Sequence, residues 1–292
     1  MHNNIYVCSL LVFFATIFFV TNDAVINYLS PKGINFYHFI FYGSPAYLIV
    51  PLFLLFKGNL IVNIKCSNYS IPLLRSFIFL PLPFFTFISL KNITLPEYTI
   101  LNMSAPIFAV LSAIFFLKEK INFLVILSLI SGFLGVYLVI QPGFNNFNPF
   151  FLLVLLGAFL ITITSTLVNK YHYVTTPIGF FIYGGIFTHL LSFIFFLYDP
   201  IFINLKTFIL ITFASIVINL AICFMTIAFY KSSKFYGSLF CLVYFQILWS
   251  IIFGMLFFDE HLSLISIFGS FFIVISGLLS IPAQYKQIQG NK

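Results

Sequence analysis

Charged side chains are scarce in this sequence, at 7% of 292 residues, and only six residues are acidic. So few charges cannot cover the surface of a water-soluble protein of this length. Hydrophobic residues make up 62% of the chain, in runs that approach the roughly 20 apolar residues a helix needs to cross a hydrocarbon core of about 30 Å. The composition therefore predicts an all-α, polytopic membrane protein.

Signatures of several function classes are also missing from the sequence. There is no Gly-x-x-x-x-Gly-Lys-Ser/Thr loop, which argues against direct use of ATP. Neither His-Glu-x-x-His nor Cys-x-x-Cys occurs, and the four cysteines lack metal or disulfide spacing, so we expect no metal and no cofactor. No filter-like loop or ring of like charges indicates a channel. The basic residues are scattered singly, so the net charge of +7 does not indicate nucleic-acid binding.

Clusters of charged residues, proline, glycine and asparagine divide the chain into ten expected transmembrane spans. The first lacks a basic leader and an Ala-x-Ala cleavage site, so it is interpreted as a span and not as a signal peptide. Ten Lys and Arg residues then face one side and three face the other, which predicts an inner-membrane protein with both termini in the cytoplasm. The expected spans are about 5–28, 35–56, 70–90, 96–117, 121–140, 149–170, 177–198, 207–230, 236–258 and 262–282.

Two similar charged turns lie about 141 residues apart. The first is Phe115-Phe116-Leu117-Lys118-Glu119-Lys120 and the second is Leu256-Phe257-Phe258-Asp259-Glu260-His261. Each lies between two apolar runs, and the second run of each pair ends close to a proline, Pro142 or Pro282. Self-similarity at a fixed spacing indicates one structural unit written twice. The charged residues are expected to meet water, to end the helices and to fix the topology.

The repeat predicts two five-helix units, residues 1–142 and 149–292, joined by a linker at 143–148. An odd number of spans per unit inverts the second copy relative to the first. Inverted repeats can rock about a central site and open it to alternate sides of the membrane. Small residues four apart predict close helix packing within each half and a scaffold role for spans 121–140 and 262–282. These pairs are Ser128/Gly132, Ser131/Gly135, Ser266/Ser270 and Ser276/Ser280.

A carboxylate inside an expected span is the first candidate for a binding site. Asp23 lies in the segment Thr21-Asn22-Asp23-Ala24, an estimated two helical turns of about 5.4 Å from the outer end of its span. An ionisable residue in a membrane helix is costly and is therefore a functional candidate. The alternative is an ion pair with an internal Lys or Arg that serves packing alone. The counterpart of Asp23 in the second unit falls near Ser165, among hydroxyl residues.

Other polar residues in the spans extend this set. Arg75 lies about five residues from the cytoplasmic end of its span, where ligand contact and snorkelling explain it equally well. Glu97 is interpreted as a helix cap. A lone His189 is usually an interhelical hydrogen-bond partner, but with Asn219 and Gln246 it falls at the depth where inverted-repeat carriers hold substrate. The candidate substrate-binding residues are Asp23, Asn22, Arg75, Asn102, His189, Asn219, Tyr244, Gln246 and Trp249. The two aromatic members could stack on a ring or face a cation.

Four short motifs lie around the first charged turn. They are Ala105-Pro106-Ile107-Phe108-Ala109-Val110, the turn residues 115–120, Gly132-Phe133-Leu134-Gly135 and Gln141-Pro142. Together with ten spans in two five-helix halves, they resemble the drug/metabolite transporter superfamily, specifically its EamA family. Four further segments are similar to the S-adenosylmethionine uptake carriers of intracellular bacteria: residues 21–29, Leu74-Arg75, Phe147-Asn148-Pro149 and Asn169-Lys170.

The inverted repeat and its sparse polar groups predict a secondary transporter, not an enzyme, that moves a small polar or cationic metabolite across the inner membrane by alternating access. The resemblance implies uptake of a cationic metabolite bearing an adenine ring, with S-adenosylmethionine the leading candidate. Asp23 would suit the positive charge, and Phe or Tyr side chains the purine face. Two alternatives stay open: an exporter of amino acids or drugs with the same fold, and a membrane enzyme or passive lipid or ion pathway. The expected partners are a small-molecule substrate and membrane lipids, with a homodimer left open and nucleic acid excluded.

Overall fold

The structure is a computed structural model that describes residues 2–29, 32–92, 98, 101–140, 148–232, 234–257 and 264–290. Every regular element within these ranges is a helix, which agrees with the composition. Eight of the described helical segments are long and apolar enough to cross a membrane. The expected spans 96–117 and 121–140 correspond to two shorter apolar helices, Ala105–Leu117 and Phe123–Val139. The protein is a polytopic helical membrane protein.

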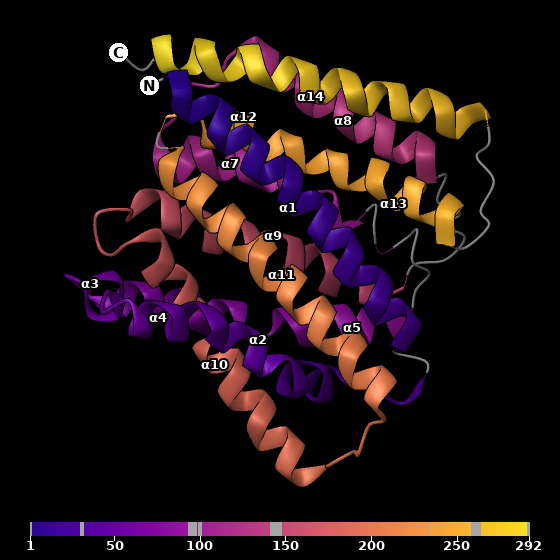
Figure 1. Ribbon diagram of the computed structural model, residues 1–292. Helices are drawn as coiled ribbons and strands as arrows, with labels where there is room; N and C mark the ends of the chain where they lie inside the picture. Colours follow the sequence, from indigo (N-terminus) through magenta and orange to yellow (C-terminus); the bar gives the residue numbers. More distant parts are fainter. Residues whose placement is uncertain are drawn as a thin grey trace.

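The helices are named in chain order (Figure 1). In the first half they are α1 (His2–Leu29), α2 (Phe36–Phe56), α3 (Leu60–Ile64), α4 (Ser70–Phe79), α5 (Leu82–Asn92), α7 (Ala105–Leu117) and α8 (Phe123–Ile140). In the second half they are α9 (Phe150–Lys170), α10 (Pro177–Tyr198), α11 (Leu205–Lys231), α12 (Tyr236–Phe240), the 3₁₀ helix η2 (Cys241–Tyr244), α13 (Phe245–Phe257) and α14 (Leu264–Gly290). Helices of the first half pack against helices of the second: α1 packs along α11, and α8 packs along α14 (Figure 1).

Two expected spans are broken where they pass the centre of the molecule. The span 70–90 divides into α4 and α5 at the turn formed by Leu80 and Pro81, because proline lacks an N–H donor and its ring clashes with the preceding helical turn. The span 236–258 divides into α12, η2 and α13. Irregular backbone at membrane depth is tolerated only where it is buried in protein or lines a cavity.

The first charged turn, residues 118–120, makes hydrogen bonds to the second half of the chain. Lys118 ends α7 in the left-handed conformation, with a φ of 55°, and the Glu119 N–H donates back to the Ala113 carbonyl at 2.9 Å, a common helix end. Glu119 itself is only 6% exposed. Its carboxylate accepts from the backbone N–H groups of Tyr236 (2.9 Å) and Gly237 (3.1 Å).

A third hydrogen bond to the Glu119 carboxylate comes from Gln287 Nε2 at 3.4 Å. The expectation that water reaches this turn is therefore wrong for Glu119, although Lys118 and Lys120 are exposed. Nothing in the local sequence separates a carboxylate that caps a distant helix from one that faces water. The second turn, Asp259-Glu260-His261, lies outside the described residues, as do Glu97 and linker residues 143–147.

Small residues allow α8 and α14 to pack backbone to backbone. A Cβ on Gly135 would lie 2.7 Å from the Gly269 carbonyl oxygen, and a Cβ on Gly269 would lie 2.7 Å from that of Gly135. Ser128 Oγ donates to the Ser276 carbonyl at 2.8 Å, and Ser276 Oγ donates to the Ser128 carbonyl at 2.7 Å. The small residues were expected to pack within each half, and this is wrong, since they join the two halves.

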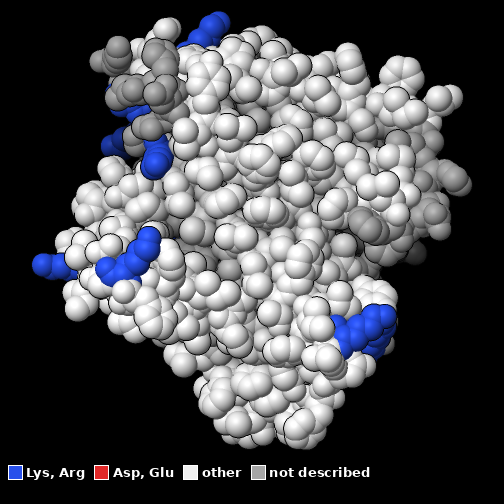
Figure 2. Space-filling view, viewed as in Figure 1, with Lys and Arg blue, Asp and Glu red and all other residues white. Residues whose placement is uncertain are grey.

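The visible surface of the molecule is almost uncharged. Figure 2 shows Lys and Arg gathered mainly at the edge where the chain ends lie, with a smaller group at the opposite edge and no acidic side chain on this face. Large apolar side chains between these edges are exposed, such as Phe268 at 68% and Phe271 at 64%. An apolar band bounded by cations is what a lipid bilayer requires of a protein surface.

Candidate substrate-binding site

A cavity of about 310 Å³ lies at the centre of the molecule, between the two halves. Its walls come mainly from α1, α2, α4 and α5 of the first half and from α9, α10 and α11 of the second, with further residues from α7, α12, η2 and α13. Phenylalanine side chains dominate the lining, including Phe19, Phe79 and Phe85, and polar groups are few. An enclosed apolar site with a few convergent polar groups is typical of small-molecule binding.

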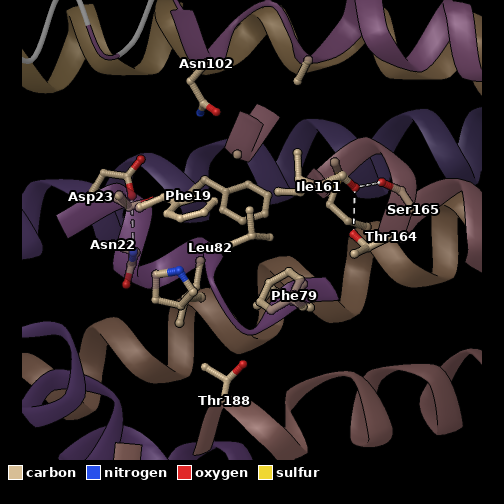
Figure 3. A pocket seen from close by; sticks show the side chains of 18 of the residues that line it. Phe19, Asn22, Asp23, Phe79, Leu82, Asn102, Ile161, Thr164, Ser165 and Thr188 are labelled. Atoms are coloured by element: carbon tan, nitrogen blue, oxygen red, sulfur yellow. Dashed lines mark hydrogen bonds between the residues drawn. The ribbon is translucent and has the colours of Figure 1, made fainter. Parts of the chain in front are cut away.

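Asp23 supplies the carboxylate of the cavity. Figure 3 shows it beside Asn22, whose Nδ2 donates to Asp23 Oδ1 at 3.3 Å. Gln246 Nε2, from α13 of the second half, lies 3.4 Å from the other carboxylate oxygen. Among the described residues no Lys or Arg forms an ion pair with Asp23, so the packing alternative is not supported there. The Oδ1 atom of Asn22 is buried and has no partner within the described part of the chain.

Arg75 supplies the only positive charge among the described residues that line the cavity. Its side chain is 6% exposed, which excludes snorkelling to the headgroups. Nη1 donates to the Phe180 carbonyl at 2.6 Å, and Nη2 donates to Thr226 Oγ1 at 3.4 Å. Its Nε atom is buried without a partner in the described residues. The guanidinium therefore keeps free N–H donors beside the cavity, the Nε–H among them.

The remaining amides and the histidine also line the cavity. His189 stacks on the Tyr47 ring, with centroids 4.1 Å apart, and its Nδ1 lies 2.8 Å from the Gly185 carbonyl. Asn219 donates to the Ser215 carbonyl at 2.8 Å within α11. Asn102, near the start of α7, completes this group. The structure thus brings seven of the nine candidate residues to one cavity: Asp23, Asn22, Arg75, Asn102, His189, Asn219 and Gln246.

The two aromatic candidates lie elsewhere. Tyr244 is fully buried and packs against Gly132 of α8, where an added Cβ would lie 2.2 Å from its ring. Trp249 Nε1 donates to Thr16 Oγ1 at 3.2 Å, and its ring meets Phe13 at 5.2 Å. Neither residue lines the cavity, so both leave the set of candidate contacts.

Hydroxyl side chains in the cavity wall were largely missed from sequence. Thr164 and Ser165 line it from α9, and both hydroxyls donate to the Ile161 carbonyl (Figure 3). Thr188 Oγ1 on α10 is buried without a partner among the described residues. Among these hydroxyl residues, the sequence pointed only to Ser165, which lies near the position in the second unit that corresponds to Asp23. Isolated threonines in apolar helices carry no other mark, since most bond back to their own helix.

Residues 4–141 match the sequence model of the EamA-like transporter family. The first half of the chain is therefore similar to this family. The resemblance found in the sequence motifs is thereby confirmed. A crystal structure of another protein shares the fold of this chain, with a TM-score of 0.76 and 15% identity over 93% of this chain and 95% of that chain.

Two relatives of this chain carry transporter names. The S-adenosylmethionine uptake transporter of Rickettsia bellii is 25% identical over 177 residues, 59% of this chain and 58% of the relative. An uncharacterized transporter of Helicobacter pylori is 28% identical over 212 residues, 70% of each chain. The match therefore spans less than two thirds of the Rickettsia protein.

Proposed function

We propose that this EamA-like protein is a secondary transporter that moves a small charged metabolite across the inner membrane by alternating access. The observation that carries the proposal is a central cavity between the two halves that contains Asp23. No cation of the described chain pairs with this carboxylate. Asp23 is partly exposed to the cavity, a charge within a membrane helix is costly unless it is paired, and a charged substrate would supply the missing partner. The family match over residues 4–141 supports transport as the activity.

Two halves threaded in opposite senses can support alternating access, and the α8–α14 contact supports this arrangement. The charged turns are about 141 residues apart, so Ser128 corresponds to Gly269 and Gly135 corresponds to Ser276. The two close contacts, Ser128 with Ser276 and Gly135 with Gly269, exchange with each other under this correspondence. That is the behaviour expected at a pseudo-two-fold axis. It favours ten spans in two inverted units, 1–142 and 149–292.

The described ends of the chain favour the predicted orientation. The N- and C-termini lie at the same end of the molecule (Figure 1), where Ser9 Oγ donates to Gln284 Oε1 at 3.3 Å. Cations gather at this edge more than at the opposite one (Figure 2). The positive-inside rule places such an edge in the cytoplasm.

S-adenosylmethionine is the leading substrate within this proposal. The name of the Rickettsia relative supports it, and the cavity offers a carboxylate for a sulfonium and phenylalanine rings for a purine. Export of amino acids or drugs is the alternative, because a secondary carrier runs down whichever gradient exists. Resistance and efflux assays in expressing cells separate the two directions.

Uptake of labelled S-adenosylmethionine tests the proposal. We expect expressing cells to accumulate the label and the Asp23→Asn variant to lose about 10- to 150-fold in affinity. This range corresponds to about 1.5–3 kcal/mol for a charge-assisted contact. Asp199→Asn is the matched control, because Asp199 is an exposed carboxylate outside the cavity, and it should transport normally. No uptake by the wild type would remove this substrate, and equal uptake by wild type and Asp23→Asn would remove the role of Asp23.

A further inference from the structure

The cavity holds two opposite charges that do not pair with each other. Among the described residues, the hydrogen-bond partners of Asp23 are two side-chain amides, and those of Arg75 are a backbone carbonyl and a hydroxyl. Both charged side chains line the same cavity. Arg75 is only 6% exposed, and its buried Nε has no hydrogen-bond acceptor among the described residues. Each charge is thus available to a ligand group of opposite sign.

The packing of α1 against α11 gives the separation of the two charges. Phe18 of α1 and Phe224 of α11 have ring centroids 5.8 Å apart, and Leu29 lies in the same apolar cluster as Ile211. The helices are therefore antiparallel, and the level of Asp23 falls near residue 218 or 219 of α11. Arg75 contacts Thr226 on that helix. With a rise of 1.5 Å per residue, the two charges lie roughly 12 Å apart along the axis.

We infer that the site binds a dipolar ion, with its positive group on Asp23 and its carboxylate on Arg75. This inference rests on the proposed transport function and narrows its substrate class. Ion-pair contacts of up to about 4 Å at each end leave roughly 4 Å or more between the two charges of the ligand, since the two side chains can also be offset across the axis. A sulfonium amino acid, with three carbon atoms between its sulfonium and its carboxylate, reaches this separation, whereas an ammonium and a carboxylate on one carbon atom do not. A planar guanidinium also matches the geometry of a carboxylate.

Arg75 is positioned for this role by its neighbours. A Cβ on Gly184 of α10 would lie 2.1 Å from Arg75 Nη1, so only glycine leaves room for the guanidinium there. Thr188, one helical turn further along α10, adds a buried hydroxyl without a partner among the described residues. The carboxylate end of the site therefore offers an N–H donor and a hydroxyl.

Two tritiated compounds test the inference: S-adenosylmethionine and decarboxylated S-adenosylmethionine, which keeps the sulfonium and the adenine but has no carboxylate. We expect wild-type protein in vesicles to prefer the carboxylated compound by at least tenfold. Arg75→Gln should reduce this preference to within about twofold, and Arg75→Lys should restore part of it. Gly184→Ala, which displaces the guanidinium without removing its charge, should also lower it. Lys57→Gln, which removes an exposed cation outside the cavity, should leave it unchanged.

A preference is a ratio within one variant, so a lower yield of folded protein does not alter it. Equal use of both compounds by the wild type, or an unchanged preference in Arg75→Gln, would overturn the dipolar site. Equilibrium binding to the detergent-purified protein separates the two proposals. Binding with the stated preference but without uptake contradicts transport alone, whereas uptake without the preference contradicts the dipolar site alone. Absence of both binding and uptake contradicts both.

Discussion

Gly135→Val is expected to lower the melting temperature of the detergent-purified protein by about 10 °C. The first atom of the new side chain would lie 2.7 Å from the Gly269 carbonyl oxygen and 2.9 Å from the Ile273 nitrogen. These are backbone atoms of α14, which cannot move aside as a flexible side chain can. The two helices must separate, at a cost of about 1–3 kcal/mol for overpacking. The loss of the serine hydrogen bonds adds about 1 kcal/mol each.

The symmetric variant provides a further test of the α8–α14 contact. A Cβ on Gly269 would lie 2.7 Å from the Gly135 carbonyl and 2.8 Å from the Val139 nitrogen, so Gly269→Val should show a similar loss. Leu134→Ala is the matched control on α8, because Leu134 is 47% exposed on the outer surface. A melting temperature within about 2 °C of the wild type for both valine variants would contradict the described packing.

The stability of the protein is expected to fall as the pH rises from about 4.5 to about 7, with Glu119 as the cause. Burial raises the pKa of Glu119 from its ordinary 4.5 to about 7, and hydrogen bonds from Gly237, Tyr236 and Gln287 offset part of this rise. The folded state therefore holds this proton more tightly than the unfolded state does. The stabilisation is fully present below pH 4.5 and is lost as the pH rises through 7, a change of about 3 kcal/mol.

Melting temperatures measured across this pH range for the wild type and Glu119→Gln test the prediction. The side chain of the glutamine variant cannot ionise, so the variant should show a shallower slope than the wild type. Its amide N–H₂ would face a backbone N–H, which lowers the stability at every pH. Lys57→Gln, which removes an exposed cation far from this contact in sequence, should keep the wild-type slope. Parallel curves for the wild type and Glu119→Gln would show that this carboxylate titrates as it does in water.

The helical segments could be predicted from sequence because apolar length is a direct requirement of the bilayer. The break between α4 and α5 could not be predicted, although a proline marks it. Pro45 and Pro51 lie inside an unbroken α2, whereas Pro81 lies in a turn between two helices. Neighbouring helices decide which proline is accommodated, and a single sequence does not report those neighbours.

Most of the cavity could be predicted because polar groups are rare in these helices, so each one stands out. The side of the helix that each residue faces was harder to predict than its depth in the membrane. Tyr244 and Gln246 are two residues apart, which corresponds to about 200° around a helix, so a Gln246 that faces the cavity turns Tyr244 away from it. The 3₁₀ segment η2 changes this phase further. The burial of Glu119 depends on a contact with residues more than 115 positions away, which no local pattern contains.

Single-cysteine labelling tests the opposite threading of the two halves most directly. Lys120 is exposed next to the start of α8, where Asn122 donates to the Ala283 carbonyl near the end of α14 at 2.8 Å. Leu264 begins α14 at its other end and is 76% exposed. With the four native cysteines replaced, Lys120→Cys should react with an impermeant maleimide only from the cytoplasm and Leu264→Cys only from the outside. Labelling of both from the same side would contradict an inverted repeat.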